Sequence, residues 1–205
     1  MKKSKLAYHL TRGGMRLKNI FFIVSILLLV SCEDEDFVPR GSQLLLNPNL
    51  SLYEDSVLPW TSTIIRNQFE TGVTREVFYS GNRSLFIENQ DSTEFASASW
   101  SQTYTGPMPK EGSTLELMAF IKGENIKSLR ADNNIFINLD ILSSNGERIQ
   151  SQSAINELEG DFDWYLLKVT LDNFPADAKS IGASVSLNSW VLGKAYFDEI
   201  NLYVK

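Results

Sequence analysis

The feature that most constrains this chain is a two-residue alternation of apolar and polar residues, which returns in segment after segment. In residues 134–142, for example, the odd positions are Ile or Leu and most of the even positions are polar. Because alternate residues of a β-strand point to opposite faces of a sheet, this pattern predicts strands with one buried face. The predicted strands are Ser84–Asn89, Phe95–Thr105, Thr114–Lys122, Asn134–Leu142, Trp164–Leu171, Ser180–Trp190 and Ala195–Val204.

Turn signals separate the predicted strands. They occur at Ser80-Gly81-Asn82, Gly106-Pro107, Ser144-Asn145-Gly146 and Asn173-Phe174-Pro175, and no segment keeps a helical period over three turns. Gly, Pro, Asn and Ser favour the backbone conformations that reverse the chain between strands. Eight or more short strands with half-polar faces predict an all-β fold, an antiparallel β-sandwich or jelly roll.

The first 32 residues have the pattern of a bacterial export signal. All their charged residues are basic, and an apolar run follows from Ile20 to Val30. Eleven residues rise only about 16 Å as a helix, which is too short to cross a hydrocarbon core of about 30 Å. We therefore predict a signal peptide over residues 1–32. Translation starts at Met1 or at Met15, since the residues from Met15 onward would form a compact signal by themselves.

The end of this leader resembles the lipobox of bacterial lipoproteins, in the residues Leu29, Val30, Ser31 and Cys32. In that family the signal is cut before the cysteine, which then carries several acyl chains, each contributing about 0.8 kcal/mol per buried methylene. Cys32 is the only cysteine, so it has no partner for an intramolecular disulfide. This favours lipidation over the alternative, a free cysteine at the end of a signal peptide.

An acidic run, Glu33–Asp36, follows the cysteine. It resembles the export signal of surface-exposed lipoproteins of the Bacteroidetes, which implies a lipid-anchored protein on the outer membrane that faces the cell exterior. The alternative is a solvated tether, and both can hold at once. Residues 33–42 are acidic and then contain Pro, Gly and Ser, so we expect a flexible tether there and a folded domain over residues 43–205.

Charge and residue content exclude several classes of function. Six of the 19 Lys and Arg residues precede Cys32, which leaves 13 basic and 25 acidic residues and a formal charge of −12. Such a surface repels phosphate backbones, so nucleic acid is excluded as a partner. The single histidine, His9, lies in the leader. The remaining chain cannot support Ser-His-Asp or Cys-His catalysis or an ordinary zinc site.

Seven short motifs follow one another in a fixed order along residues 43–205. They are Leu45–Leu50, Pro59-Trp60, Ser80–Leu85, Trp100-Ser101-Gln102, Ile121–Ile126, Gly160–Trp164 and Ala195–Ile200. This order resembles the jelly-roll carbohydrate-binding modules of the galactose-binding-like superfamily, which are attached to xylanases and glucanases and occur in gut-bacterial lipoproteins. The resemblance implies a non-catalytic domain that binds a polysaccharide or oligosaccharide at the cell surface, next to glycan-degrading or uptake proteins.

The same resemblance implies a structural calcium ion where the opening segment meets the last strand. Asp198 matches the carboxylate of the closing motif, and oxygen ligands suit a hard cation. The chain departs from the family at Leu50-Ser51, where relatives have Phe-Glu, so one expected acidic ligand is missing. The alternative is that Asp198 accepts hydrogen bonds from backbone amides at a strand end.

Sugar binding requires aromatic faces that stack on pyranose rings, surrounded by amide and carboxylate groups that bond to hydroxyls. Two predicted strands carry such a stripe on the face opposite their apolar residues. We expect the ligand-binding residues to be Phe136, Asn138 and Asp140 on one strand and Asn188 and Trp190 on the other, joined by Trp100 and Gln102. The alternatives are that the aromatic residues cover the core or lie under loops, and that Trp100 belongs to the core.

We do not expect catalysis. Glycosidases need only two carboxylates, but the E-x-D-x-x-E motif of jelly-roll glycosidases is absent from the sequence. The acidic residues Glu157, Glu159, Asp161 and Asp163 are scattered over a predicted loop, where we expect them to promote solubility. The alternative function is a structural or adhesive module that binds a protein partner, which would require a broader apolar patch on its surface.

Overall fold

The structure, a computed structural model, describes residues 37–66, 68–91, 96–130, 135–188 and 190–205, and residues 36–205 form one compact unit. These described residues contain ten β-strands and no helix, and hence no helix that could cross a membrane. The strands are β1 (Thr61–Ile65), β2 (Phe69–Thr74), β3 (Ser84–Asn89), β4 (Ser97–Tyr104), β5 (Leu115–Ser128), β6 (Ile135–Leu142), β7 (Arg148–Ile155), β8 (Gly160–Leu171), β9 (Ser180–Asn188) and β10 (Val191–Val204).

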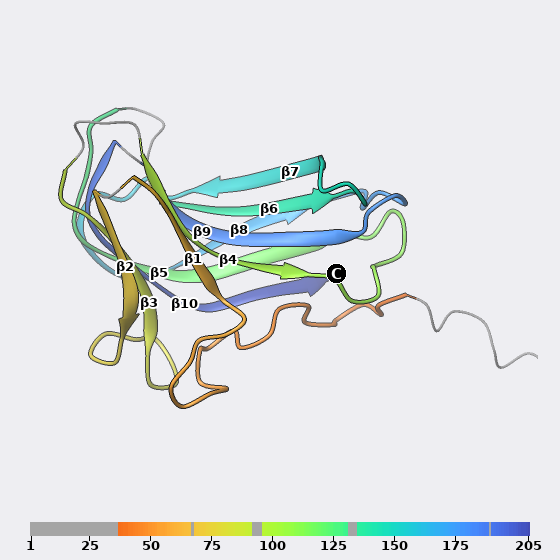
Figure 1. Cartoon of the computed structure of the whole chain (residues 1–205), viewed down its shortest axis with the longest axis horizontal. Coiled ribbons are helices and arrows are strands. Elements are labelled where there is room, and N and C mark those ends of the chain that lie inside the picture. The colour runs from red at the N-terminus through yellow and green to blue at the C-terminus, as the bar shows by residue number, and fades with distance from the viewer. Residues whose placement is uncertain (1–36, 67, 92–95, 131–134, 189) are drawn as a thin grey trace, which may run out of the picture. The chain divides into compact units, whose positions relative to one another are not determined.

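The strands form two five-stranded sheets that pack face to face (Figure 1). The first sheet has the order β1-β4-β9-β6-β7, and the second has the order β2-β3-β10-β5-β8. All neighbouring strands pair antiparallel. The prediction of an all-β antiparallel sandwich is therefore confirmed.

The core lies between the two sheets and follows from the alternation in the sequence. On β6, Ile135, Ile137, Leu139 and Ile141 are all fully buried, whereas the residues between them are partly exposed. The strand β5 of the second sheet repeats this pattern over its first seven residues. Burial of these side chains from both sheets supplies the main favourable free energy of folding.

The folded unit begins earlier than the predicted boundary at residue 43. Residues 37–42, which were expected to be tether, pack on the sandwich: the Val38 N–H donates to the Met108 carbonyl at 3.2 Å and the Gly41 N–H donates to the Val204 carbonyl at 2.7 Å. The remainder of the predicted tether, together with Cys32 and the leader, lies outside the described residues. The opening segment (residues 37–50) is thus part of the fold.

Three strands were not predicted: β1, β2 and β7. Every residue of β1 is exposed, and β7 is mostly exposed, so neither has the buried face that produces a clear alternation. All three are edge strands of their sheets. Several predicted ends also changed. The strand β5 continues past Lys122 to Ser128, and β9 stops at Asn188 instead of Trp190. The strands β8 and β10 each begin four residues earlier than predicted, at Gly160 and Val191.

Candidate functional site

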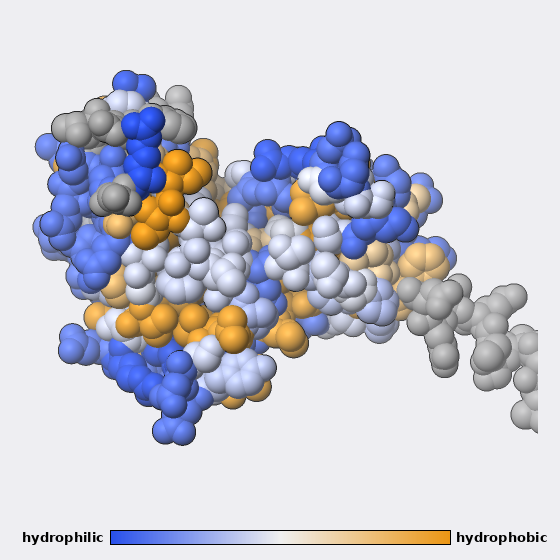
Figure 2. Space-filling model, viewed as in Figure 1, coloured by the Kyte–Doolittle hydropathy of each residue, from blue (hydrophilic) through white to orange (hydrophobic). Residues whose placement is uncertain are grey.

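The outer face of the first sheet is a broad surface of small polar side chains. Strand pairing places Phe136 beside Ser186 and Asn138 beside Ser184 on the neighbouring strand. We define the serine-rich face as the outward residues Ser97, Ser99, Ser101, Phe136, Asn138, Asp140, Ser151, Ser153, Ser184, Ser186 and Asn188. Figure 2 shows pale residues of intermediate hydropathy in the middle of the molecule, bordered by orange hydrophobic patches and, farther out, by hydrophilic regions.

A hydrogen-bonded network fixes the polar side chains beside Phe136. The Asn138 amide donates to Asp140 Oδ2 at 2.6 Å, and the Ser153 hydroxyl donates to Asn138 Oδ1, also at 2.6 Å. The Arg148 Nε lies 2.8 Å from Asp140 Oδ1. Because each group is held by a neighbour, these donors and acceptors are preorganised, which lowers the entropy lost on binding a ligand.

The expected stripe on β9 ends before it reaches Trp190. The strand stops at Asn188, and Trp190 lies in the turn that leads into β10, where its carbonyl accepts a hydrogen bond from the Leu129 N–H at 2.8 Å. The Arg130 guanidinium lies over the indole ring, 3.6 Å from its centroid. Asn188 therefore shares the serine-rich face with Phe136 and Asn138, whereas Trp190 lies beyond the end of that face.

The expectation that Trp100 and Gln102 join the exposed face is wrong. Their side chains point into the sandwich, where they are only 7% and 6% exposed. The Trp100 indole N–H donates to the Phe86 carbonyl at 3.1 Å. Gln102 bonds the opening segment through both ends of its amide, accepting from the Leu46 N–H at 2.7 Å and donating to the Leu46 carbonyl at 2.9 Å. Both residues have a structural role.

Asp198 is fully buried on β10, under the loop between β2 and β3. Its Oδ2 accepts hydrogen bonds from the N–H groups of Tyr79 at 2.8 Å and Ser80 at 2.9 Å, and its Oδ1 accepts from the Glu199 N–H at 2.7 Å. Desolvation raises the pKa of Asp198 to about 6, although the three N–H donors act in the opposite direction. Asp198 therefore ties a loop to the sheet.

The residues around Asp198 do not fit the calcium ion that the resemblance implied. Calcium requires six to eight oxygen ligands, and both oxygens of this carboxylate already accept N–H donors. Across the described ranges, no group of three or more His, Cys, Asp or Glu side chains lies close enough to hold a metal. The observed contacts match the alternative, in which Asp198 binds backbone amides at a strand end.

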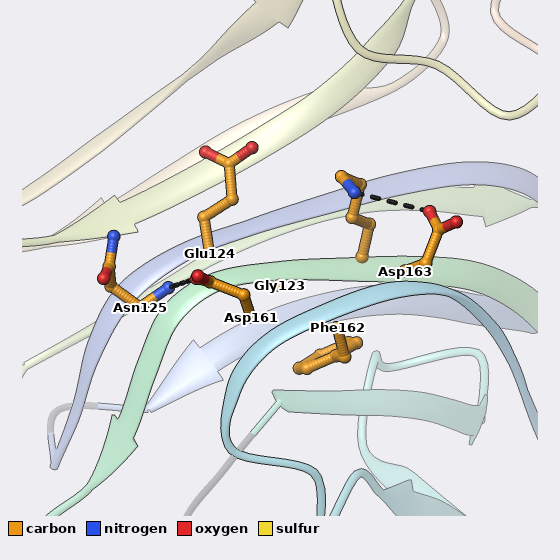
Figure 3. Close-up of a pocket in the computed structure, with 7 residues that line it drawn as sticks. Gly123, Glu124, Asn125, Asp161, Phe162 and Asp163 are labelled. Atoms are coloured by element: carbon orange, nitrogen blue, oxygen red, sulfur yellow. Dashed lines mark hydrogen bonds and ion pairs between the residues drawn. The ribbon is translucent and has the colours of Figure 1, made fainter.

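A hollow of about 440 Å³, which was not among the predicted sites, lies on the second sheet where β5 pairs with the edge strand β8 (Figure 3). Asp161 accepts a hydrogen bond from the Asn125 N–H at 2.7 Å, and the Lys122 ammonium lies 3.3 Å from Asp163. The Trp164 N–H and Lys122 lower the pKa of Asp163. Asp161 and Asp163 were expected in a loop, but they belong to β8.

One sequence signal pointed to this hollow, namely Gly123 at the end of a strongly alternating segment. Glycine inside a strand often marks a bulge or a close approach of another group. A Cβ at Gly123 would lie only 2.3 Å from the ring of Phe162, and the pairing of β5 with β8 shifts on both sides of this residue. The sequence prediction ended the strand here, whereas the strand continues through a bulge.

Comparison with known proteins identifies relatives in fold alone. No family model and no curated protein matches the sequence. TmCBM61, solved with β-1,4-galactotriose, is 17% identical with a TM-score of 0.52, and the match covers 80% of this chain and all of that domain. The CBM22-1 xylan-binding domain of Xyn10C from Paenibacillus barcinonensis is 16% identical with a TM-score of 0.52, covering 82% and 97%.

Enzymes share the fold as well. The enzymatically active domain of tailspike protein 4 from bacteriophage CBA120 is 14% identical with a TM-score of 0.60, but the chain spans only 21% of its length. Cyclases from Fischerella sp. TAU also match. These structural similarities establish a β-sandwich of the kind found in carbohydrate-binding modules. Proteins with this fold differ in function, so the function depends on the residues of the site.

Proposed function

We propose that this protein binds a neutral or weakly charged polysaccharide without cleaving it, through the serine-rich face. The observation that carries the proposal is the position of Phe136 beside the network of Asn138, Asp140 and Arg148 on an open sheet face. The fold shared with the CBM61 and CBM22 modules, whose structures concern galactotriose and xylan, supports the same class of ligand.

The chemistry of this face suits a sugar chain. Its Ser side chains are short, so a sugar ring can approach the sheet closely and bond to their hydroxyls, which both donate and accept hydrogen bonds. Phe136 supplies the apolar ring against which the C–H surface of a sugar can stack. Asn138, Asp140 and Arg148 supply an amide, a carboxylate and a guanidinium in fixed positions for further hydroxyls.

The serine-rich face favours binding over catalysis. Among its described residues Asp140 is the one carboxylate, whereas glycosidases act through a pair of carboxyl groups. Asp140 is also held by Asn138 and Arg148. We therefore propose a non-catalytic role.

The location belongs to the proposal too. The resemblance of residues 29–32 to a lipobox and of residues 33–36 to a surface-export signal supports a lipoprotein anchored through Cys32 to the outer membrane and facing the exterior. There the domain would hold glycan chains for neighbouring degradation or uptake proteins. Intact mass of the membrane-extracted protein tests the anchor, since a chain without acyl groups at Cys32 contradicts it.

A glycan array with the purified protein tests the binding function. The wild type is expected to retain at least one neutral polysaccharide, and Phe136→Ala is expected to weaken that binding at least tenfold by removing the stacking ring. Phe78→Ala is the matched control, because Phe78 is an exposed phenylalanine in the loop between β2 and β3, outside the face. If Phe136→Ala binds the glycan as strongly as the wild type, the assignment of the site to the serine-rich face is contradicted. An array without any bound glycan contradicts the proposed function.

One observation favours a second candidate function, the binding of a protein partner. The opening segment and the loop that leads from it to β1 expose three leucines, Leu46, Leu52 and Leu58, each more than half accessible. Exposed leucines of this kind are typical of interaction surfaces. An array without any bound glycan would favour this second function. It would be supported further if the protein self-associates in analytical ultracentrifugation and the double change Leu52→Ser and Leu58→Ser abolishes that association.

A further inference from the structure

Three adjoining hollows form a groove across the outer face of the second sheet. A hollow of about 200 Å³ shares Glu88 and Gln90 with one of about 540 Å³, which shares Glu124 and Asn125 with the hollow of about 440 Å³ in Figure 3. Their lining residues come from the region of all five strands, from β2 to β8. With strands about 4.8 Å apart, this polar groove is about 19 Å long, long enough for a short oligosaccharide.

A β-bulge between β10 and β5 shapes the backbone at this groove. The pairing of β10 with β5 shifts at Gly193, which has a φ of +106°, and a Cβ there would lie 2.5 Å from the Asn125 carbonyl oxygen. Asn125 itself has a φ of +54°. Bulges and strained residues of this kind are concentrated at functional sites, where they redirect side chains. Here they direct Glu124 and Asn125 into the two larger hollows.

The groove offers donors and acceptors side by side. The Lys194 ammonium lies 3.2 Å from Glu88 and 4.1 Å above the ring of Phe86. The Tyr196 hydroxyl donates to Glu124 at 2.8 Å. Phe69, Phe86 and Tyr196 are buried, and Phe162 is the partly exposed ring among the described lining residues. The groove therefore presents mainly charged and amide groups, which would recognise a ligand through its hydroxyls.

The charges select the class of ligand. Five carboxylates line the three hollows against three ammonium groups: Glu70, Glu88, Glu124, Asp161 and Asp163, against Lys122, Lys127 and Lys194. This excess of negative charge disfavours acidic sugars. A neutral saccharide fits, because each hydroxyl can donate to a carboxylate and accept from an ammonium.

We propose that this groove is a second saccharide-binding site, on the side of the sandwich opposite the serine-rich face. The proposal rests on the proposed glycan-binding function and extends it. The outer faces of two packed sheets point in opposite directions, so one domain engages two separate chains and links them. Bivalent attachment also raises the avidity for a polymer beyond the affinity of either site.

Isothermal titration calorimetry tests the groove, with xylotriose, β-1,4-galactotriose and the neutral oligosaccharide that ranks first on the array. We expect the wild type to show two sites per chain. Phe136→Ala should weaken binding to the serine-rich face at least tenfold and leave one site, and Glu124→Ala should do the same to the groove. Glu124→Gln keeps the hydrogen bond from Tyr196 and serves if the alanine variant does not fold. Glu116→Ala is the matched control, since Glu116 lies on the same strand but pairs with Lys205 outside the groove.

The outcomes separate the two proposals. One site per chain that Phe136→Ala removes overturns the groove and leaves the proposed function standing. One site that only Glu124→Ala removes supports the groove and overturns the assignment of the serine-rich face. No heat with any of the saccharides overturns both proposals.

Discussion

At the scale of single residues, buried polar side chains join segments that are far apart in the sequence. Gln102 bonds both backbone groups of Leu46, and Trp100 bonds the Phe86 carbonyl. The Asn89 amide donates to the Val191 carbonyl at 2.7 Å. Each of these contacts satisfies a backbone group that would otherwise be buried without a partner, at a cost of about 1–3 kcal/mol.

The buried carboxyl of Asp198 makes stability depend on pH. Burial raises its pKa to about 6 from an ordinary value of 3.8. The folded state then binds the proton more tightly than the unfolded chain, so this contribution to stability is greatest in acid and decreases as the pH rises from about 4 through 6. Between pH 5 and pH 7 we expect the decrease to be about 1 kcal/mol.

Urea unfolding at these two pH values measures the effect. The free energy of unfolding of the wild type, relative to that of Asp198→Asn, is expected to decrease by about 1 kcal/mol from pH 5 to pH 7, because asparagine does not titrate. Asp177→Asn, at an exposed position, is the control and is expected to follow the wild type. A difference between wild type and Asp198→Asn that is the same at both pH values would contradict the prediction.

At the scale of elements, the bulge at Gly193 shapes the beginning of β10 and the groove beside it. Gly193→Ala adds a Cβ that meets the Asn125 carbonyl oxygen at 2.5 Å and the Glu124 carbonyl oxygen at 2.7 Å, in a left-handed conformation. Strain of that conformation alone costs about 1–2 kcal/mol, and the two close contacts add to it. We expect Gly193→Ala to lower the unfolding free energy by more than 2 kcal/mol.

Gly146→Ala is the matched control for this prediction. Gly146 has a φ of +79°, but a Cβ there meets no atom within 4 Å, so only the conformational strain applies. Urea unfolding of both variants separates strain from contact. Equal losses of stability would show that the close approach of β5 to β10 is unimportant.

Comparison of elements also explains how far the sequence could predict the fold. The strands β6 and β9 were predicted from their alternation because both have one buried face. The exposed strand β1 lacks that pattern, and Asp161 and Asp163 were expected in a loop because charged residues are rare in strands. Pairing with neighbouring strands, which no local pattern reveals, places all of them in the sheets.

The candidate site was predictable to a similar extent. Alternation predicted correctly that Phe136, Asn138 and Asp140 share one face of β6, and β9 adds Asn188 to the same side. For Trp100 and Gln102 the same alternation gave two possible faces, because Ser and Thr on the other side are also compatible with burial. The groove depends on a bulge and on contacts between distant strands, which the period of a single segment does not contain.

At the scale of the whole molecule, Asp198 links the last strand to the loop between β2 and β3, and both of its oxygens already accept backbone N–H donors. We therefore expect calcium added after chelation to release no heat in calorimetry and to leave the melting temperature unchanged. Magnesium at the same concentration is the control for nonspecific effects on an acidic protein. A calcium-specific rise of the melting temperature that Asp198→Asn abolishes would restore the site implied by the resemblance.

The opening segment gives the molecule a mechanical property. It runs antiparallel to the end of β10, joined by bonds from Gly41 to Val204 at 2.7 Å, from Val204 to Ser42 at 3.1 Å and from Leu44 to Leu202 at 2.8 Å. If the chain is anchored through Cys32, as proposed, any pull from a captured glycan reaches the membrane through these bonds. A force along the segment loads these three bonds at the same time instead of breaking them one by one. The opening segment would therefore resist being pulled from the sheet.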